Sequence, residues 1–511
     1  MLTRIHSAAT LGLEARVLDI EVDASGGFPR FTIVGLPDAA VREARERVRS
    51  ALKNSGFTFP SGTVTVNLAP ADFRKSGAAL DLPVALGLAA LGGDASAGRR
   101  VIVGELGLGG EVRPIRGALC LALAARDAGF PEIVLPAASA REASAVDGIR
   151  VIPVPHLTDA AGHLFGGRTV APLARTDAEA SPSTPPPDFS DLRGQLVARR
   201  AAEIAAAGGH HLLLTGPPGA GKTMLARRLP GILAPLTDGE ALEVTRVHSV
   251  AGTLPAGAGL IRTPPFRAPH HGISAPGLVG GGARPVPGEM SLAHRGALFL
   301  DEIAEFRRDA LEAIRQPLEE RAITVVRVGG ACVFPCDVLL VAAMNPCPCG
   351  FAGDPRRSCA CDPRERSRYA RKLSGPFLDR IDLHVVMRDL PWPELRSSAV
   401  AEPSAAIRSR VEAARVCAAS RRPGRAGFRN GDLTAQELVQ HCPLDGAGAR
   451  VLETAVGRLH LSARAIHRAL RVARTIADLA KSERVLSSHL SEALSFRPTT
   501  TSPISCPIEQ G

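Results

Sequence analysis

The stretch "LLLTGPPGAGKTML", residues 212–225, limits the fold of this chain more than any other feature. An apolar run ends there in a loop rich in glycine and proline that carries a lysine and a threonine. Because glycine has no Cβ, backbone N–H groups in such a loop can converge on an anion. The spacing G-x-x-x-x-G-K-[ST] is typical of a phosphate-binding loop between a strand and a helix. The loop residues are Gly216, Pro217, Pro218, Gly219, Ala220, Gly221, Lys222 and Thr223.

The chemistry of this loop predicts that the chain binds ATP together with Mg²⁺. Backbone N–H groups from Gly219 to Lys222 are expected to surround the β-phosphate, helped by the N-terminus of the following helix. Lys222 would neutralise oxygens of the β- and γ-phosphates, and the Thr223 hydroxyl would ligate Mg²⁺.

Two other apolar runs also end in polar side chains. "GALFLDEIAEF" leads into Asp301 and Glu302, and "VAAMNPCPCG" leads into Asn345. Ligands of parallel α/β sheets bind at the carboxyl ends of the strands, so these side chains are expected beside the phosphate loop. Asp301 suits the surroundings of Mg²⁺, Glu302 can polarise an attacking water, and Asn345 can orient that water. Taken alone, the acid pair could be a solvated turn, and Asn345 before proline could be a turn residue.

Two arginines have open roles. "GPFLDRIDLHV" places Arg380 between two aspartates, and "SARAIHRALRVARTIADLA" is a helical segment, capped by Ser462, that carries Arg464. An arginine can stabilise transition-state charge in a neighbouring subunit. From the residues alone, a surface Asp–Arg pair is the favoured interpretation of Arg380. Arg464 is either a sensor of ATP or part of a solvated helix face.

Four of the ten cysteines cluster in "CPCGFAGDPRRSCACD". They are Cys347, Cys349, Cys359 and Cys361. Four thiolates so close together could bind one tetrahedral Zn²⁺, although the C-x-C spacing differs from the common C-x₂-C pattern. A reduced surface loop is the alternative. A metal at this place would stiffen the segment that follows Asn345.

Composition limits the remaining choices. A chain of 511 residues is too long for one core, so several domains are expected. The net charge of +10 permits nucleic-acid binding without establishing it. With one Trp and one Tyr, extended stacking on bases is not expected to be the main binding mode. No apolar run reaches the ~18 residues of a membrane helix, and no signal-peptide core is found, so a cytoplasmic protein without membrane contact is expected.

The order of patterns along the chain predicts an α+β block, a linker, an α/β block and a helical block. Strands are expected at residues 64–70 and 100–108, and helices at 38–56 and 79–92. The segment 174–195 is rich in proline, serine and acidic residues and has the composition of an extended linker. The last block, about 390–494, has helical periodicity.

Together, the motifs quoted above and the strings "TPPFRAPHHGIS" and "GEMSLAHRGALFLDE" closely resemble the magnesium-chelatase-like AAA+ ATPases of the ComM/YifB family. The resemblance implies a ring, a hexamer in that family, with ATP bound between subunits. It identifies Lys222 and Thr223 with Walker A, Asp301 and Glu302 with Walker B, and Asn345 with sensor 1. It also implies that Arg380 is an arginine finger acting in trans and that Arg464 is sensor 2.

The resemblance extends to two further segments. Residues 264–296 are similar to an insertion that reaches toward the pore in this family, and the pair His270–His271 is expected to pack the insertion rather than to bind metal. The N-terminal block is similar to a domain shared with Lon protease and RadA-type recombination ATPases. Proteolysis needs a serine and a lysine, but Leu119 stands at the lysine position and Gly77, beside Ser76, at the serine position. We therefore expect an inactive protease fold that serves assembly or DNA contact.

The expected architecture is an N-terminal Lon-protease-like (S5-type α+β) domain, a central AAA+ phosphate-loop domain with a parallel α/β sheet, and a C-terminal helical lid. The expected boundaries are 1–170, a linker at 171–190, 191–390 with the cysteine cluster at 347–361, 391–496, and a tail at 497–511.

The favoured function is a DNA motor, a homo-oligomeric ring that hydrolyses ATP and drives helicase or branch-migration activity on single-stranded or branched recombination intermediates, as in natural transformation. The arginine-rich stretch "ASRRPGRAGFR" and the helix of Arg464 support DNA contact. One alternative is a chelatase-type motor subunit that remodels a protein partner. Another is a factor related to ATP-dependent proteases, which the missing lysine disfavours.

Overall fold

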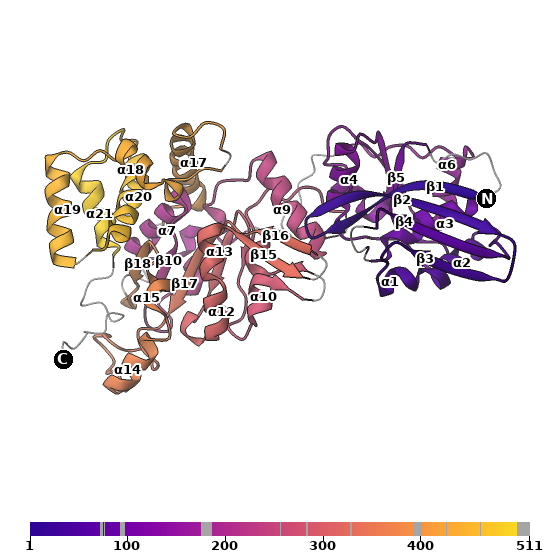
Figure 1. Ribbon diagram of the computed structural model, residues 1–511. Coiled ribbons are helices and arrows are strands. Elements are labelled where there is room, and N and C mark those ends of the chain that lie inside the picture. The colour runs from indigo at the N-terminus through magenta and orange to yellow at the C-terminus, as the bar shows by residue number, and fades with distance from the viewer. Residues whose placement is uncertain are drawn as a thin grey trace.

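The computed structural model describes residues 1–71, 75, 77–91, 98–174, 186–255, 257–282, 285–327, 330–392, 394, 401–425, 427–459 and 461–497. Two sheet-containing bodies lie side by side, and a group of helices near the carboxyl end packs on the far side of the second body (Figure 1). None of the described helices is long and apolar enough to cross a lipid bilayer.

The first body is built on a mixed seven-stranded sheet with the order β3-β4-β2-β1-β5-β8-β9. Its long hairpin pairs β1 with β2 in antiparallel register, and β4 continues that face, with Val64, Val66 and Leu68 pointing into the core. Helices α2, α3 and α6 cover one face of the sheet, and α4 and α5 cover the other. The strands are β1 (Leu2–Leu11), β2 (Glu14–Ser25), β3 (Arg30–Val34), β4 (Thr63–Ala69), β5 (Arg100–Ile102), β8 (Glu132–Pro136) and β9 (Arg150–Val154), with the small pair β6 (Glu105–Leu106) and β7 (Val112–Arg113) beside them.

The helices of this body confirm the expected positions with two differences. They are α1 (Ala39–Arg42), α2 (Ala44–Asn54), α3 (Asp81–Ala89), α4 (Ala118–Asp127), α5 (Ala140–Ala143) and α6 (Leu157–Phe165), with short 3₁₀ turns at Ala78–Leu80 and Ala137–Ser139. The expected helix 38–56 is interrupted at Glu43, and the expected strand 100–108 is divided into β5 and β6. The spacing of apolar residues does not reveal the one-residue break at Glu43, because the helices on both sides of it bury the same face.

The second body is built on a five-stranded, fully parallel sheet with the order β11-β14-β17-β10-β18. The strands are β10 (Leu212–Thr215), β11 (Phe266–Arg267), β14 (Ala297–Leu300), β17 (Leu339–Met344) and β18 (Leu383–Val386). Leu212 and Leu214 face the helices α7, α17 and α20, whereas Leu213 faces the layer of α10, α11 and α12. Both faces are covered, which explains why these strands read as continuous apolar runs.

The remaining elements surround this sheet. They are α7 (Leu196–Gly208), α8 (Lys222–Ala226), α9 (Asp238–Ala251), α10 (Ala275–Val279), β12 (Gly280–Gly281), β13 (Val286–Pro287), α11 (Glu289–Leu292), α12 (Arg308–Ala313), α13 (Arg315–Glu320), the hairpin β15 (Ala322–Arg327) and β16 (Gly330–Pro335), α14 (Pro363–Ala370) and α15 (Gly375–Leu378), with 3₁₀ turns at Phe189–Asp191, Leu229–Gly231, Ile303–Glu305 and Asn430–Asp432.

The block near the carboxyl end is helical, as its periodicity predicts. It contains α17 (Ser404–Ser420), α18 (Ala435–His441), α19 (Gly446–Leu459), α20 (Ala463–Leu479) and α21 (Ser487–Ser495). The expected cap of α20 is confirmed, since the Ser462 hydroxyl accepts a hydrogen bond from the Ala465 N–H at 3.2 Å.

The two bodies meet where α4 packs on α9. The Gly117 N–H donates to the Ser249 carbonyl at 3.1 Å, and the Arg246 guanidinium donates to the Leu13 carbonyl at 2.9 Å. Gly12, in the turn of the β1–β2 hairpin, lies against Cys332 of β16. The N-terminal sheet therefore contacts the second body through α9 and the β15–β16 hairpin.

We predict that Gly296→Ala destabilises the second body by about 1–3 kcal/mol. A Cβ at residue 296 would lie 1.9 Å from the Pro265 carbonyl oxygen, which accepts the Ala297 N–H where β11 pairs with β14. Gly239→Ala is the matched control, because a Cβ there meets nothing within 4 Å inside α9. Chemical denaturation measures the free energy of unfolding of both variants. Equal denaturation midpoints for Gly296→Ala and Gly239→Ala would contradict the packing argument.

Candidate nucleotide-binding site

The carboxyl ends of β10, β14 and β17 meet at one edge of the parallel sheet. Leu300 is level with Ala342, and Thr215 is level with Met344, so the residues that follow these strands are neighbours. The Thr223 hydroxyl donates to Asp301 Oδ2 at 2.7 Å, and Lys222 Nζ donates to Asn345 Oδ1 at 3.1 Å. The structure thus brings together the phosphate loop and the polar residues at the ends of two other strands.

The phosphate loop approaches β18 so closely that residue 216 has no room for a side chain. A Cβ at Gly216 would lie 2.5 Å from the Met387 carbonyl oxygen. Gly219, at the outside of the loop, has φ +85° and meets nothing within 4 Å. The loop is therefore held at its base and open at its tip, where an anion would approach the backbone.

Lys222 is largely buried at the base of this loop. Its ammonium donates to the carbonyls of Gly216 at 2.6 Å and Pro217 at 2.9 Å, besides Asn345. Burial lowers the pKa of Lys222, and the nearby carboxylates of Asp301 and Glu302 partly oppose that shift. All three partners are neutral oxygens, so a triphosphate, with charged oxygens, would offer this ammonium stronger hydrogen bonds.

Asp301 and Glu302 form a tight turn at the end of β14. Asp301 Oδ1 accepts the Glu302 N–H at 3.0 Å, and Glu302 has φ +51°, in the left-handed region. That conformation costs a residue with a side chain about 1–2 kcal/mol. Strain of this kind gathers at functional sites, where surrounding structure enforces it. The turn leaves the Glu302 side chain 55% exposed at the mouth of the site.

His271 comes closer to Glu302 than the sequence indicated. β11 pairs with β14, and the residues after β11 carry the ring of His271 to 3.7 Å from a carboxylate oxygen of Glu302. His270 and His271 have ring centroids 4.0 Å apart. The expectation of a pair that only packs the insertion is therefore incomplete. The missed signal is the position of these histidines directly after a strand adjacent to the one that carries Glu302.

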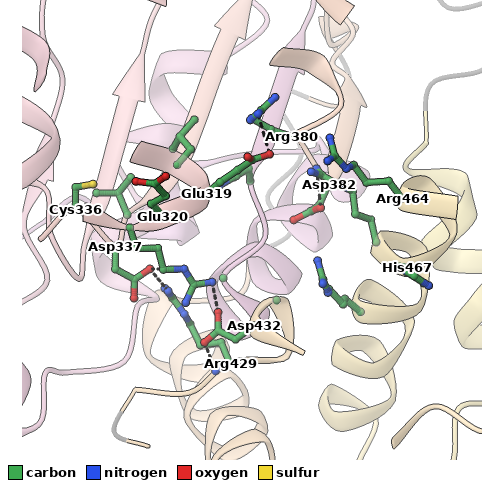
Figure 2. Close-up of a pocket in the computed structure, with 18 of the residues that line it drawn as sticks. Glu319, Glu320, Cys336, Asp337, Arg380, Asp382, Arg429, Asp432, Arg464 and His467 are labelled. Carbon is green, nitrogen blue, oxygen red and sulfur yellow. Dashed lines mark hydrogen bonds and ion pairs between the residues drawn. The ribbon is translucent and has the colours of Figure 1, made fainter. Parts of the chain in front are cut away.

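Arg380 and Arg464 lie together, but at the opposite edge of the sheet. Both line a cavity of about 620 Å³ with His211, Val338 and Asp382, which directly precede β10, β17 and β18 (Figure 2). Arg380 forms an ion pair with Glu319 at 2.8 Å. The cavity is lined by seven arginines and five carboxylates, namely Arg321, Arg380, Arg425, Arg429, Arg464, Arg468, Arg471, Glu319, Glu320, Asp337, Asp382 and Asp432.

Two buried aspartates of this cavity are held ionised. Burial would raise the pKa of Asp337, but the guanidinium groups of Arg429, Arg321 and Arg295 outweigh burial and hold this pKa below its usual range. Burial would also raise the pKa of Asp382, but the hydrogen bond to His210 and the charge of Arg468 outweigh burial and lower this pKa. The cavity therefore contains ion pairs around buried aspartates, and arginines outnumber carboxylates in its lining.

The arginine-rich stretch 419–429 is engaged within the chain. Arg421 binds Asp478 at 2.5 Å, Arg422 pairs with Glu437 at 3.2 Å, and Arg429 pairs with Asp337. In the Arg464 helix, Arg468 pairs with Asp382 at 3.3 Å. These ion pairs hold Arg421, Arg422, Arg429 and Arg468 against other parts of the chain, and the DNA contact that the sequence favoured stays a prediction.

The structure also shows where the four clustered cysteines lie and what stands at the positions compared with the serine and lysine of Lon protease. The four cysteine thiols of Cys347, Cys349, Cys359 and Cys361 gather directly after β17 and form the only cluster with metal-ligand spacing in the described part of the chain. Leu119 is fully buried in an apolar cluster, so no base stands at that position. Gly77, with φ +90°, precedes a 3₁₀ turn, and Ser76 lies outside the described residues.

We predict that Glu302→Gln keeps ATP binding and lowers turnover at least about 100-fold, because an amide cannot take a proton from water. Asp309→Asn is the matched control, since Asp309 is an exposed carboxylate paired only locally with Arg307. Phosphate release and nucleotide affinity measured on both variants test this, and unchanged turnover in Glu302→Gln would remove Glu302 from that role.

Three sequence profiles of one family match the chain in order. "Subunit ChlI of Mg-chelatase" matches residues 20–139, "Magnesium chelatase, subunit ChlI" matches residues 188–395, and "Magnesium chelatase, subunit ChlI C-terminal" matches residues 401–497. Together they cover the second sheet, the helical block and the part of the first sheet between the middle of β2 and β8.

Relatives align over almost the whole length. An uncharacterized protein of Mycobacterium tuberculosis is 45% identical over 98% of this chain and 99% of its own. The competence protein ComM of Haemophilus influenzae is 43% identical over 96% of this chain and 97% of its own. The protein YifB of Escherichia coli is 42% identical over 97% of both chains. The chain therefore belongs to the ComM/YifB family of magnesium-chelatase-like AAA+ ATPases.

Proposed function

We propose that this protein is a ring-forming motor that hydrolyses ATP and acts on DNA, with helicase or branch-migration activity on recombination intermediates. The observation that carries the proposal is that the two ends of the strands in the second sheet carry different groups of residues. The phosphate loop and the acidic residues lie at one edge, and Arg380 and Arg464 lie at the other.

The proposed nucleotide chemistry follows from the contacts at the first edge. The Thr223 hydroxyl and the Asp301 carboxylate, 2.7 Å apart, are hard oxygen donors that suit Mg²⁺. Lys222 would exchange its carbonyl partners for phosphate oxygens. Bound Mg²⁺ neutralises phosphate charge in such sites. Glu302 would polarise the attacking water, and Asn345 would orient it.

The second edge supports an assembly of several copies. β10 has four residues, so its ends are about 13 Å apart at about 3.3 Å per residue. Arg380 and Arg464 thus lie too far from the phosphate loop of their own chain to contact its nucleotide. A neighbouring copy could present its nucleotide to both arginines, as expected for a ring. We propose a hexamer, because the family resemblance implies one.

The DNA part of the proposal rests on the net charge of +10 and on similarity to the competence protein ComM of Haemophilus influenzae. We also propose that the first body is an inactive Lon-like domain at 1–170, followed by a linker at 171–190, an ATPase core at 191–390, a helical lid at 391–496 and a tail. The main alternative remains a chelatase-type subunit that remodels a protein partner.

The deciding experiment measures ATP hydrolysis with and without single-stranded and branched DNA, together with branch migration of a labelled junction. We expect DNA to raise the ATPase rate and ATP to be required for migration. Binding should weaken as salt rises, because phosphate contacts release counterions. Lys222→Ala should abolish migration.

An ATPase rate that DNA does not change, with no DNA binding at low salt, would contradict the DNA part and favour a protein partner. Release of no phosphate under any nucleic-acid condition would contradict the motor itself.

We further predict that Arg380→Ala lowers turnover about 10³-fold and that mixing it with Lys222→Ala restores part of the activity. In a mixed ring, Arg380 of a Lys222→Ala copy can serve the intact phosphate loop of an Arg380→Ala neighbour. Arg307→Ala is the control, since Arg307 is exposed and paired only with Asp309. If the mixture stays inactive while both variants form rings, Arg380 does not act in trans.

A further inference from the structure

Two short segments bring four cysteines into one cluster beside the phosphate loop. Cys347 and Cys349 directly follow β17, and Cys359 and Cys361 directly precede α14. The Sγ atom of Cys359 lies 3.6 Å from those of both Cys347 and Cys349, which are themselves 3.3 Å apart. All four Sγ atoms lie within 4.8 Å of one another.

This spacing matches a tetrahedral metal site better than a pair of disulfides. All four cysteines are free thiols, and a disulfide needs sulfur atoms about 2.05 Å apart. Four sulfurs at about 2.3 Å from one Zn²⁺ are about 3.8 Å from each other, close to the separations observed. Hydrogen bonds from backbone N–H groups also reach the cluster, from Ala352 to Cys347 and from Cys349 to Cys361, both at 3.3 Å. Such bonds stabilise thiolates that ligate a metal.

The loop between the two cysteine pairs packs closely against the phosphate loop. Gly350 has φ +87°, and a Cβ there would lie 2.6 Å from Cδ of Pro218. Its N–H donates to the Cys347 carbonyl at 3.0 Å, so its position depends directly on the first ligand pair. Just before the cysteines, the side-chain oxygen of Asn345 accepts a hydrogen bond from the Lys222 ammonium at 3.1 Å. The cysteine segment therefore touches the phosphate loop at two points, one apolar and one polar.

We propose that Cys347, Cys349, Cys359 and Cys361 bind one structural Zn²⁺ and that this metal clamps residues 345–350 against the phosphate loop. Without the metal, two segments joined only by thiols separate, and Pro218 loses its packing partner. The clamp shapes the loop before any nucleotide arrives. Only its consequence for ATP affinity rests on the proposed function.

The metal is tested first, on wild-type protein purified without chelator. Elemental analysis should find about one zinc per chain, and cobalt substitution should give the visible absorption of a tetrahedral thiolate site. The double variant Cys359→Ser, Cys361→Ser should lose the metal, whereas Cys417→Ser, which changes an exposed free cysteine, should keep it. Absence of metal in the wild type, or iron in place of zinc, would overturn the assignment.

The clamp is tested by amide hydrogen exchange without nucleotide. Exchange of the backbone N–H groups of Gly216 and of residues 219–222 should become about tenfold faster when zinc is removed from the wild type, and also in the double variant. Strands β1 and β2 serve as an internal standard, because their exchange should stay unchanged if the chain remains folded. If the wild type holds zinc but its removal leaves exchange at Gly216 and residues 219–222 unchanged, the clamp is overturned.

Nucleotide affinity separates this inference from the proposed function. Zinc removal should raise the Kd for ATP about tenfold or more, as for other losses of supporting contacts. If no form of the protein binds ATP while zinc still slows exchange of the loop, the proposed function fails and the clamp stands.

Discussion

The parallel pairing of β10 between β17 and β18 is the interaction on which the rest of the second body depends. It sets Leu212 level with Val341 and with Leu383, so that three strands end at the same edge of the sheet. The phosphate loop then leaves the sheet beside Asn345, and one strand further along lies Asp301. Because the strands are buried on both faces, slippage by one residue would move apolar side chains between layers, which makes the register stringent.

The same pairing gives the opposite edge of the sheet a different chemistry. Residues before the strands cannot reach the phosphate loop, and here they meet α20 instead. His210 bonds Thr475 at 2.8 Å, and Asp382 joins His210 and Arg468. Buried ion pairs of this kind specify an arrangement more than they stabilise it. The helical block is thereby fixed to the sheet at the edge where Arg380 and Arg464 lie.

Three segments far apart in sequence converge on the nucleotide edge. The insertion brings His271 to Glu302, the cysteine loop brings Gly350 to Pro218, and the chain after β18 brings the Met387 carbonyl against Gly216. Each contact constrains a different part of the site: the first constrains the Glu302 carboxylate, the second the phosphate loop at Pro218, and the third the base of that loop at Gly216. The site is thus a meeting point for several parts of the second body, which is suited to couple hydrolysis to events elsewhere.

The sequence by itself determined the elements and the chemistry of the nucleotide edge. Apolar runs ending in Gly216, Asp301 and Asn345 are readable because a buried parallel strand must be apolar and its polar ligands must follow it. Only the tertiary structure decided which residues meet across the chain. Arg380 and Arg464 share a cavity away from the phosphate loop, His271 reaches Glu302, and three arginines of the basic stretch 419–429 form ion pairs within the chain. No local pattern records these contacts, because side-chain partners tens of residues apart are set by how strands and helices pack, not by spacing along the chain.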